Sequence, residues 1–206
     1  SDVYKRQDEE SILFDTGFHE DTVLHNAKVL NKDLSKVNKV VLSHFHSGDH
    51  TGGLIKLRQV YKELNPDAFS EVYVARGFFD QRYFKDGSME GPGNYKDSSK
   101  FKKAAEEEGI SFIILDDYKK ISNNLYATGT VKRVVEKYNG PKGFYLDKDL
   151  TIPDIIRDDQ SVGMLTDNGW IMMSGCGHSG IINTAMKLQS IKNEPVYGAI
   201  GGFHLF

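Results

Sequence analysis

The sequence has little cysteine, no long apolar run and no excess of positive charge. Its single cysteine, Cys176, excludes an internal disulfide and any metal cluster built from several cysteines. This usage fits a reducing compartment, and we take the cytoplasm as the default location. No apolar stretch approaches the roughly 20 residues that span a bilayer, and the net charge of −3 offers no basic field for a nucleic-acid backbone. We therefore expect neither a membrane segment nor a nucleic-acid partner, and the oligomeric state stays open.

The rest of the composition is that of an ordinary globular protein. With 206 residues, 39% of them apolar, the chain is long enough for one domain with a substantial core. Residues 1–7 (SDVYKRQ) have no initiating Met and no apolar periodicity, so we expect them to be a non-native scar. The chain stops soon after an apolar run at 196–200. We expect residues 8–206 to form a domain that is incomplete at both ends.

Apolar spacing in the first 60 residues or so alternates between the patterns of strands and helices. It predicts a strand at 11–14, a helix at 21–30, a strand at 39–42 and a helix at 53–61, an order typical of α/β layers. Later helices are predicted at 101–109 and 181–191, later strands at 71–75, 111–115, 125–128, 131–135, 161–166, 170–174 and 196–200, and long loops at 79–100 and 136–149. The dipeptide Asn168-Gly169 predicts a hairpin between two of these strands.

The densest chemistry follows the strand predicted at 39–42. Four side chains able to bind a metal lie within seven residues, His44, His46, Asp49 and His50. Histidine and carboxylate are ligands of a divalent ion such as zinc, and a strand end is where ligands usually bind in α/β proteins. A solvated turn gives no reason for three histidines. We therefore predict a metal site here.

The same order of apolar strand, small residues and histidine occurs twice more along the chain. His178 follows Gly175-Cys176-Gly177, and His204 follows Gly201-Gly202. Strand ends that meet at one edge of a sheet would bring these histidines to the first cluster, around one pair of metal ions. The alternative for His178 is an ordinary histidine at the start of a helix. Both histidines are retained as candidate ligands.

These motifs resemble those of the metallo-β-lactamase superfamily, whose hallmark is His-x-His-x-Asp-His at a strand end. Residues 42–54 read LSHFHSGDHTGGL, and Asp15-Thr16-Gly17 resembles the upstream turn of the family. Within it, the chain is similar to the dihydropteroate-synthase-like branch related to dihydropterin-aminobenzene-phosphate synthase. That similarity lies in Pro153-Asp154, Asp158-Asp159-Gln160, GCGHSGI at 175–181 and GGFHL at 201–205. The resemblance covers residues 8–206 and implies an αββα sandwich, here truncated at both ends.

The resemblance also implies roles for the candidate ligands. His44, His46 and His178 would hold one divalent ion, and Asp49 and His50 would contribute to a second. His204 falls where the family has a later ligand. Zinc is the expected metal, with Mn²⁺ and Fe²⁺ as alternatives, and Asp49 would also orient the nucleophile and accept a proton.

One departure from the family pattern concerns the second ion. Ser47 and Gly48 both stand between His46 and Asp49, where the family has a single residue. If Gly48 bulges outward, Asp49 and His50 keep their places, because glycine adopts conformations closed to other residues. If it does not, the second site is distorted or lost.

The activity implied by the resemblance is that of a metal-dependent hydrolase. It would use a metal-activated hydroxide on an ester, phosphoester or related bond of a small molecule, with a phosphorylated or pterin-like substrate. The first alternative is a metal-binding fold without activity. The second is a diiron oxidoreductase, against which His46 argues because those relatives carry glutamate at that position.

Several other residues have two interpretations. Asp158 and Asp159 either orient metal-binding histidines or belong to a solvated turn, and the aromatic segment 78–84 either covers a substrate ring or packs on the core. Cys176 is predicted to be a small buried packing residue rather than a ligand. His19 and His25 are predicted to be surface residues.

Overall fold

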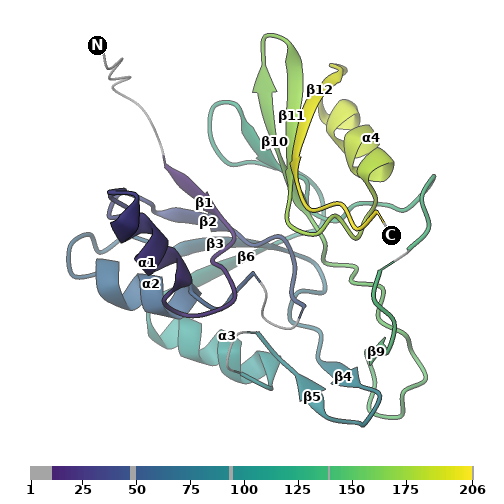
Figure 1. Cartoon of the computed structure of the whole chain (residues 1–206), viewed down its shortest axis with the longest axis horizontal. Coiled ribbons are helices and arrows are strands. Elements are labelled where there is room, and N and C mark those ends of the chain that lie inside the picture. The colour runs from purple at the N-terminus through teal and green to yellow at the C-terminus, as the bar shows by residue number, and fades with distance from the viewer. Residues whose placement is uncertain (1–10, 47–49, 93–94, 139, 206) are drawn as a thin grey trace.

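The computed structural model describes residues 11–46, 50–92, 95–138 and 140–205. Two sheets stack face to face, and helices cover the outer face of each (Figure 1). This arrangement confirms the predicted αββα sandwich. The expected scar at 1–7, together with Gly48 and Asp49, lies outside the described residues. No helix among the described residues has the length and apolar character needed to cross a membrane.

The first sheet contains four parallel strands in the order β1-β2-β3-β6. They are β1 (Ile12–Phe14), β2 (Lys39–Val41), β3 (Glu71–Ala75) and β6 (Ser111–Leu115). The helices on its outer side are α1 (Thr22–Val29), α2 (Leu54–Tyr61) and α3 (Ser98–Glu107) (Figure 1). α3 starts three residues before the predicted position, because the Asp97 carboxylate accepts the backbone N–H groups of Ser99 and Lys100 and caps the helix there.

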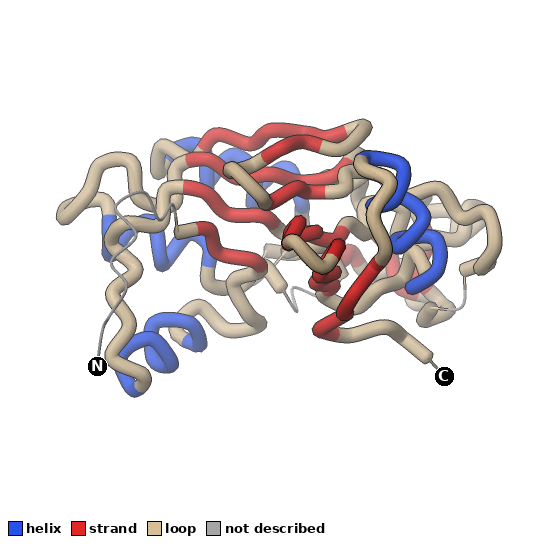
Figure 2. Tube along the Cα trace, turned by 90° about the horizontal axis from the view of Figure 1, so that it is seen from above, coloured by secondary structure: helices blue, strands red, loops and turns tan. Residues whose placement is uncertain are grey.

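The second sheet contains five strands in the order β12-β11-β10-β8-β7. They are β7 (Lys119–Lys120), β8 (Leu125–Ala127), β10 (Ser161–Thr166), β11 (Gly169–Ser174) and β12 (Val196–Gly201), and α4 (Ile181–Ile191) lies on the outer side (Figures 1 and 2). β10 and β11 pair from Ser161↔Ser174 to Thr166↔Gly169, which confirms the hairpin predicted from Asn168-Gly169. β12 runs parallel to β11.

Three apolar clusters lie between the four layers. Successive side chains of a strand point to opposite faces of its sheet, so neighbouring residues belong to different clusters. Val40 of β2 packs with the helices α1–α3, whereas its neighbour Val41 packs between the two sheets. In β11, Met172 packs with the cluster next to α4, whereas Met173 contacts the cluster between the sheets. Each sheet is therefore covered on both faces.

A third, small antiparallel sheet joins the two segments predicted as long loops. It contains β5 (Met89–Glu90), β4 (Arg82–Phe84) and β9 (Phe144–Tyr145) in that order. Strand pairing between β4 and β9 brings the first loop segment against the second, below the main sheets in Figure 1.

The strand predicted at 131–135 is wrong. The N–H groups of Val134 and Val135 donate to the side-chain oxygen of Asn183 on α4, at 3.0 and 2.9 Å. Because this side chain satisfies the backbone donors, the segment needs no partner strand. Both valine side chains are exposed, so the apolar pattern did not mark a buried face.

Candidate metal centre

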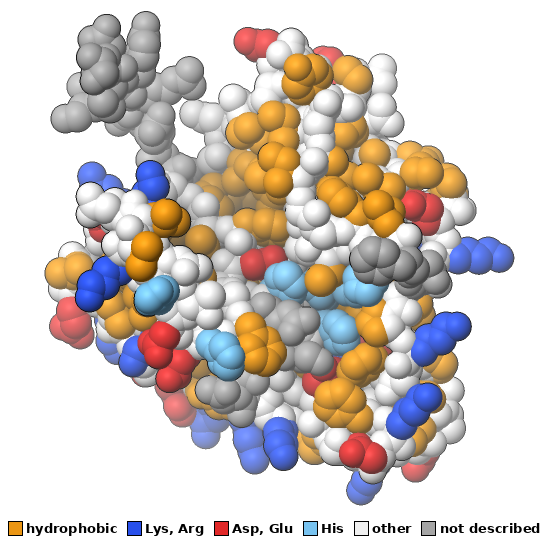
Figure 3. All heavy atoms as spheres, in the orientation of Figure 1, with side chains coloured by type: hydrophobic (Ala, Val, Ile, Leu, Met, Phe, Trp, Pro, Cys, Tyr) orange, Lys and Arg blue, Asp and Glu red, His pale blue; other side chains and the backbone are white. Residues whose placement is uncertain are grey.

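Four strands end at the same place in the sandwich. Asp15 follows β1 and His44 follows β2, and these two strands are parallel neighbours. His178 and His204 follow β11 and β12, which are also parallel neighbours. Histidine side chains accordingly gather near the middle of the face drawn in Figure 3. The structure thus brings the predicted histidine segments together.

His44, His46 and His178 form the most buried group of this cluster. One ring nitrogen from each lies within 4.8 Å of the other two. The ring centroids of His44 and His178 are 4.8 Å apart, and those of His46 and His178 are 5.7 Å apart. These are the three histidines predicted to hold the first metal ion.

Burial and hydrogen bonding test whether this group fits a cation. Nε2 of His44, which is fully buried, has no hydrogen-bond partner, and neither ring nitrogen of His178, which is 4% exposed, has one. A buried polar atom left unpaired costs about 1–3 kcal/mol. A divalent ion among the three rings would satisfy Nε2 of His44 and one ring nitrogen of His178, so the donor set fits a metal such as zinc.

The protonation states agree with this fit. Burial, followed by the nearby His204 and His46 rings, lowers the pKa of His178 to about 2. Burial and the neighbouring histidines also lower the pKa of His44 well below its usual value. Both rings are therefore neutral at pH 7 and present lone pairs, the form in which imidazole binds metals.

Ser43 and Asp15 fix the orientation of His44. The Ser43 hydroxyl hydrogen-bonds Nδ1 of His44 at 2.9 Å, which leaves Nε2 facing the cluster. The Ser43 N–H in turn donates to the Asp15 carboxylate at 2.7 Å. A partner on the second ring nitrogen is the usual device for orienting a metal-binding histidine.

Asp158 and Asp159 fix the backbone beside two of the histidines. The Asp158 carboxylate accepts the N–H of Phe45, the residue after His44, at 2.7 Å. The Asp159 carboxylate accepts the N–H of Ser179, the residue after His178, at 2.8 Å. Both aspartates are buried, so the solvated-turn interpretation is wrong. Burial raises the pKa of Asp159 to about 6.

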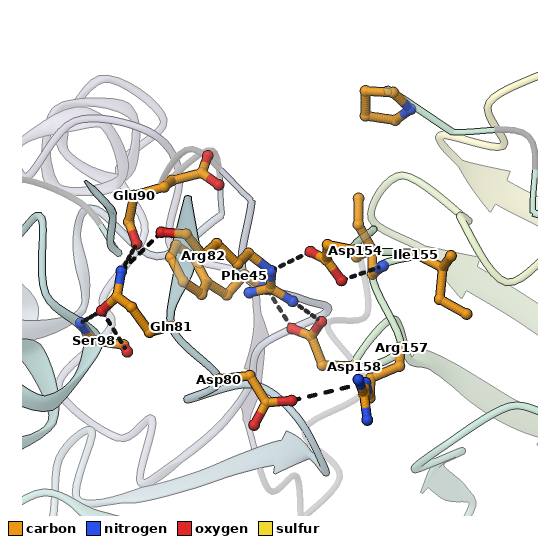
Figure 4. Close-up of polar contacts among 12 residues, drawn as sticks. Phe45, Asp80, Gln81, Arg82, Glu90, Ser98, Asp154, Ile155, Arg157 and Asp158 are labelled. Atoms are coloured by element: carbon orange, nitrogen blue, oxygen red, sulfur yellow. Dashed lines mark hydrogen bonds and ion pairs between the residues drawn. The ribbon is translucent and has the colours of Figure 1, made fainter. Parts of the chain in front are cut away.

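Arg82 lies beneath the histidine loop and was not foreseen from the sequence. Its guanidinium is fully buried, donates to Asp154 and Asp158, and lies 4.5 Å from the centroid of the Phe45 ring (Figure 4). Asp158 therefore connects Arg82 on β4 with the backbone between His44 and His46. No periodic pattern in the sequence marks such a pair, since its members are 76 residues apart.

His50 is held by the turn that follows β1. Its Nδ1 lies 2.9 Å from the Asp15 carboxylate, and its carbonyl accepts the Thr16 N–H at 2.8 Å. Burial lowers the pKa of His50, but hydrogen bonds to Asp15 and Cys176 outweigh burial and raise it to about 10. The predicted partner in the second metal site, Asp49, lies outside the described residues.

The glycines after His50 are required by close packing against the same turn. A Cβ atom on Gly52 would lie 1.7 Å from the Phe18 carbonyl oxygen, and one on Gly53 would lie 2.4 Å from that of Thr16. Only glycine lets the two backbones approach so closely. The Asp-Thr-Gly turn and the histidine motif are thus parts of one packed unit.

Cys176 and His204 lie beside the first group. The rings of His178 and His204 are 4.4 Å apart, and Sγ of Cys176 lies 3.3 Å from Nε2 of His50. Cys176 is partly exposed, so the prediction of a buried packing residue is wrong. His19 and His25 are exposed, as predicted.

Two hollows adjoin the histidines. One, of about 350 Å³, is lined by Lys137, His178 and His204 among others. The second, more open, includes Lys85, Lys142 and Phe144, and the Phe144 ring lies 4.6 Å from that of His46. The aromatic segment 78–84 serves mainly the core, because Phe78 and Phe79 pack there, whereas Phe84 contacts Phe144.

Comparison with known proteins places this geometry in a family. Residues 3–65 match the model of the metallo-β-lactamase superfamily. The chain is 28% identical over 201 residues to 7,8-dihydropterin-6-methyl-4-(β-D-ribofuranosyl)-aminobenzene-5′-phosphate synthase of Methanocaldococcus jannaschii, covering 94% of this chain and 65% of that protein. It is 31% identical over 202 residues to an uncharacterized protein of the same organism, covering 94% of this chain and 68% of that protein.

A solved structure agrees with the sequence relatives. A crystal structure described as a metal-dependent hydrolase of the β-lactamase superfamily aligns with a TM-score of 0.72 and 26% identity, over 95% of this chain and 67% of that one. The chain spans about two thirds of the length of the curated relatives. On its motifs, its fold and these relatives, the chain belongs to the metallo-β-lactamase superfamily.

Proposed function

We propose that this chain is a metal-dependent hydrolase that cleaves an ester, phosphoester or related bond in a small molecule. The observation that carries the proposal is that donor atoms of His44, His46 and His178 lie within 4.8 Å of one another, and that the buried ring nitrogens of His44 and His178 that face this group have no hydrogen-bond partner. Membership of the superfamily supports a metal-dependent activity of this kind.

We assign two ions to the centre. His44, His46 and His178 hold the first, while Asp49, His50 and His204 contribute to the second. A centre dominated by imidazole favours zinc, with Mn²⁺ and Fe²⁺ as alternatives. When bound, such an ion lowers the pKa of a coordinated water to about 7 and polarises the bond to be cleaved.

The protein's own residues would position and deprotonate the reactants. Asp15 holds the His50 ring, and Asp158 and Asp159 hold the backbone beside His44 and His178. Asp49 orients the nucleophile and accepts a proton. With the His50 ring and the backbone beside His44 and His178 held in advance, little reorganisation of these parts is needed when a substrate arrives.

The substrate we favour is small and phosphorylated, with a pterin-like ring as one form of it. Lys85 and Lys142 line the open hollow next to Phe144, where an anionic group and an aromatic ring would both find partners. The name of the curated synthase relative supports this choice. It also raises a second candidate function, a bond-forming reaction on such a compound, which product analysis would separate from hydrolysis.

Metal content and turnover together test the proposed function. The chain, loaded with Zn²⁺ or Mn²⁺, is assayed on nitrophenyl esters, phosphomonoesters and phosphodiesters, alongside His46→Ala and the matched control His25→Ala. We expect His46→Ala to lose metal and at least about 100-fold in kcat/KM, while His25→Ala, which changes an exposed histidine, retains both. Turnover that survives the loss of His46 would refute the mechanism.

A further inference from the structure

We propose that Cys176 is a ligand of the second metal ion, which it binds through its sulfur as a thiolate. The inference rests on the proposed function and adds to it a donor of a different chemical kind. The second centre would then combine sulfur with imidazole, a ligand set that zinc accepts and that hard cations such as Mg²⁺ do not.

The groups of nearby donor atoms lead to this residue. Among the described residues, ligand atoms lie within 4.8 Å of one another in three groups: His44–His46–His178, His44–His50–Cys176 and Cys176–His178–His204. If the first group holds one ion, His44 is no longer available to the second group and His178 is no longer available to the third. What remains is Cys176 with His50, or Cys176 with His204. An ion in either place takes the sulfur, because Cys176 is common to both.

The distance between sulfur and nitrogen fits a shared ion. Zinc lies about 2.3 Å from a thiolate sulfur and about 2.0–2.1 Å from an imidazole nitrogen, so two such ligands at a tetrahedral angle are about 3.5 Å apart. Sγ of Cys176 and Nε2 of His50 are 3.3 Å apart. A small adjustment of either side chain therefore admits an ion between them.

Other contacts point the donors toward the same space. Asp15 occupies Nδ1 of His50, which leaves Nε2 for the side of Cys176. The buried, unpaired nitrogens of His44 and His178 are assigned to the first ion, and both residues belong to the donor groups that contain Cys176. The position proposed for the second ion therefore directly adjoins the first.

The binding step is a simple exchange of proton for metal. The S–H bond breaks, its proton passes to solvent, and the electron pair left on sulfur forms the bond to the ion. Where His50 is the second ligand, Nε2 likewise releases its proton to solvent and binds the ion through the freed lone pair. Nothing is oxidised or reduced. Cys176 is partly exposed, so both the ion and the departing proton have a path.

Cobalt substitution provides a readout other than activity. Titration of the metal-free chain with Co²⁺ is expected to produce an intense near-ultraviolet band from sulfur-to-cobalt charge transfer. Since the chain has a single cysteine, this band can arise only from Cys176. We expect Cys176→Ser to lack the band and His25→Ala to retain it. In the wild-type protein, Zn²⁺ should also slow labelling of the thiol, because a sulfur bound to the ion is not free to act as a nucleophile.

The outcomes separate this inference from the proposed function. Binding of Co²⁺ without the charge-transfer band, and thiol labelling that Zn²⁺ does not slow, would overturn the role of Cys176 and leave the hydrolase proposal standing. Failure to bind either metal would overturn both. If Cys176→Ser does not fold, the wild-type band and the protection of its thiol decide the question.

Discussion

Replacing Arg82 by methionine should destabilise the protein severely, because it breaks a buried ionic cluster. Arg82 is fully buried and donates to Asp154 and Asp158, both of which are also buried. Removing one partner from such a cluster leaves uncompensated charge in the interior, which costs about 3–5 kcal/mol. The contact with the Phe45 ring, which is lost as well, contributes up to about 2 kcal/mol when desolvated.

The measurement is urea unfolding of metal-free protein at pH 7. We expect Arg82→Met to lower the free energy of unfolding by about 3–5 kcal/mol. The matched control is Arg76→Met, which breaks an ion pair with Asp116 whose side chains are 66% and 64% exposed. Because solvent screens exposed charges, that pair should contribute little to stability. Arg82→Lys keeps a charge but cannot donate to both carboxylates in the same way, so its free energy of unfolding should lie between those of Arg82→Met and the wild type.

The difference in the free energy of unfolding between Arg82→Met and the wild type should also depend on pH, which gives a second check. In Arg82→Met, burial raises the folded-state pKa of Asp158 above its unfolded value, and no arginine remains beside it to lower the pKa. The unfavourable contribution of the Asp158 carboxylate is therefore present at high pH and disappears as the group is protonated. The gap between variant and wild type should narrow from pH 7 to pH 5. The reasoning would be refuted if Arg82→Met and Arg76→Met lost equal amounts of unfolding free energy. It would also be refuted if the difference between Arg82→Met and the wild type grew in acid.

Two further predictions concern the metal centre without its metal. The pKa of His178 is about 2 when folded and about 6.5 when unfolded. Below pH 6.5 the unfolded chain takes up a proton that the folded protein does not, so the free energy of unfolding is highest above pH 6.5 and decreases as the pH falls. Between pH 7 and pH 5 the loss is about 2 kcal/mol, and His178→Gln should lack it in urea unfolding; parallel pH profiles would contradict this. Gly52→Ala should cost about 2 kcal/mol or more through its clash with Phe18, whereas Gly198→Ala, which meets nothing within 4 Å, should be nearly neutral in thermal unfolding.

The spacing of apolar residues was enough to predict several of the helices and strands around the metal centre. Residues 71–75, 111–115 and 181–191 form their predicted elements with the predicted bounds. The segment at 131–135 failed because its apolar residues are exposed and its backbone is satisfied by Asn183. Periodicity reports which side chains could face a core, and it cannot report a backbone donor satisfied by a distant side chain.

Some residues of the candidate site could likewise be predicted from the sequence, and others could not. The density of histidine at a strand end, and its recurrence at His178 and His204, could be recognised without a structure. Two residues beside it could not. Arg82 lies in a segment predicted as a loop and Cys176 was predicted to be a packing residue, and the contacts of each with distant segments are visible only in the folded structure.

By itself, then, the sequence determined most of the helices and strands and the histidines that follow the strand ends, since each depends on residues close together in the chain. The αββα layering was implied only by the resemblance to the family. Only the tertiary structure decided that Asp158 and Asp159 hold the backbone beside the histidines. It also brought Cys176 beside His50, 126 residues away. The physical reason is that these contacts depend on which strands pair in parallel and where their ends converge, and strand pairing is a property of the whole fold.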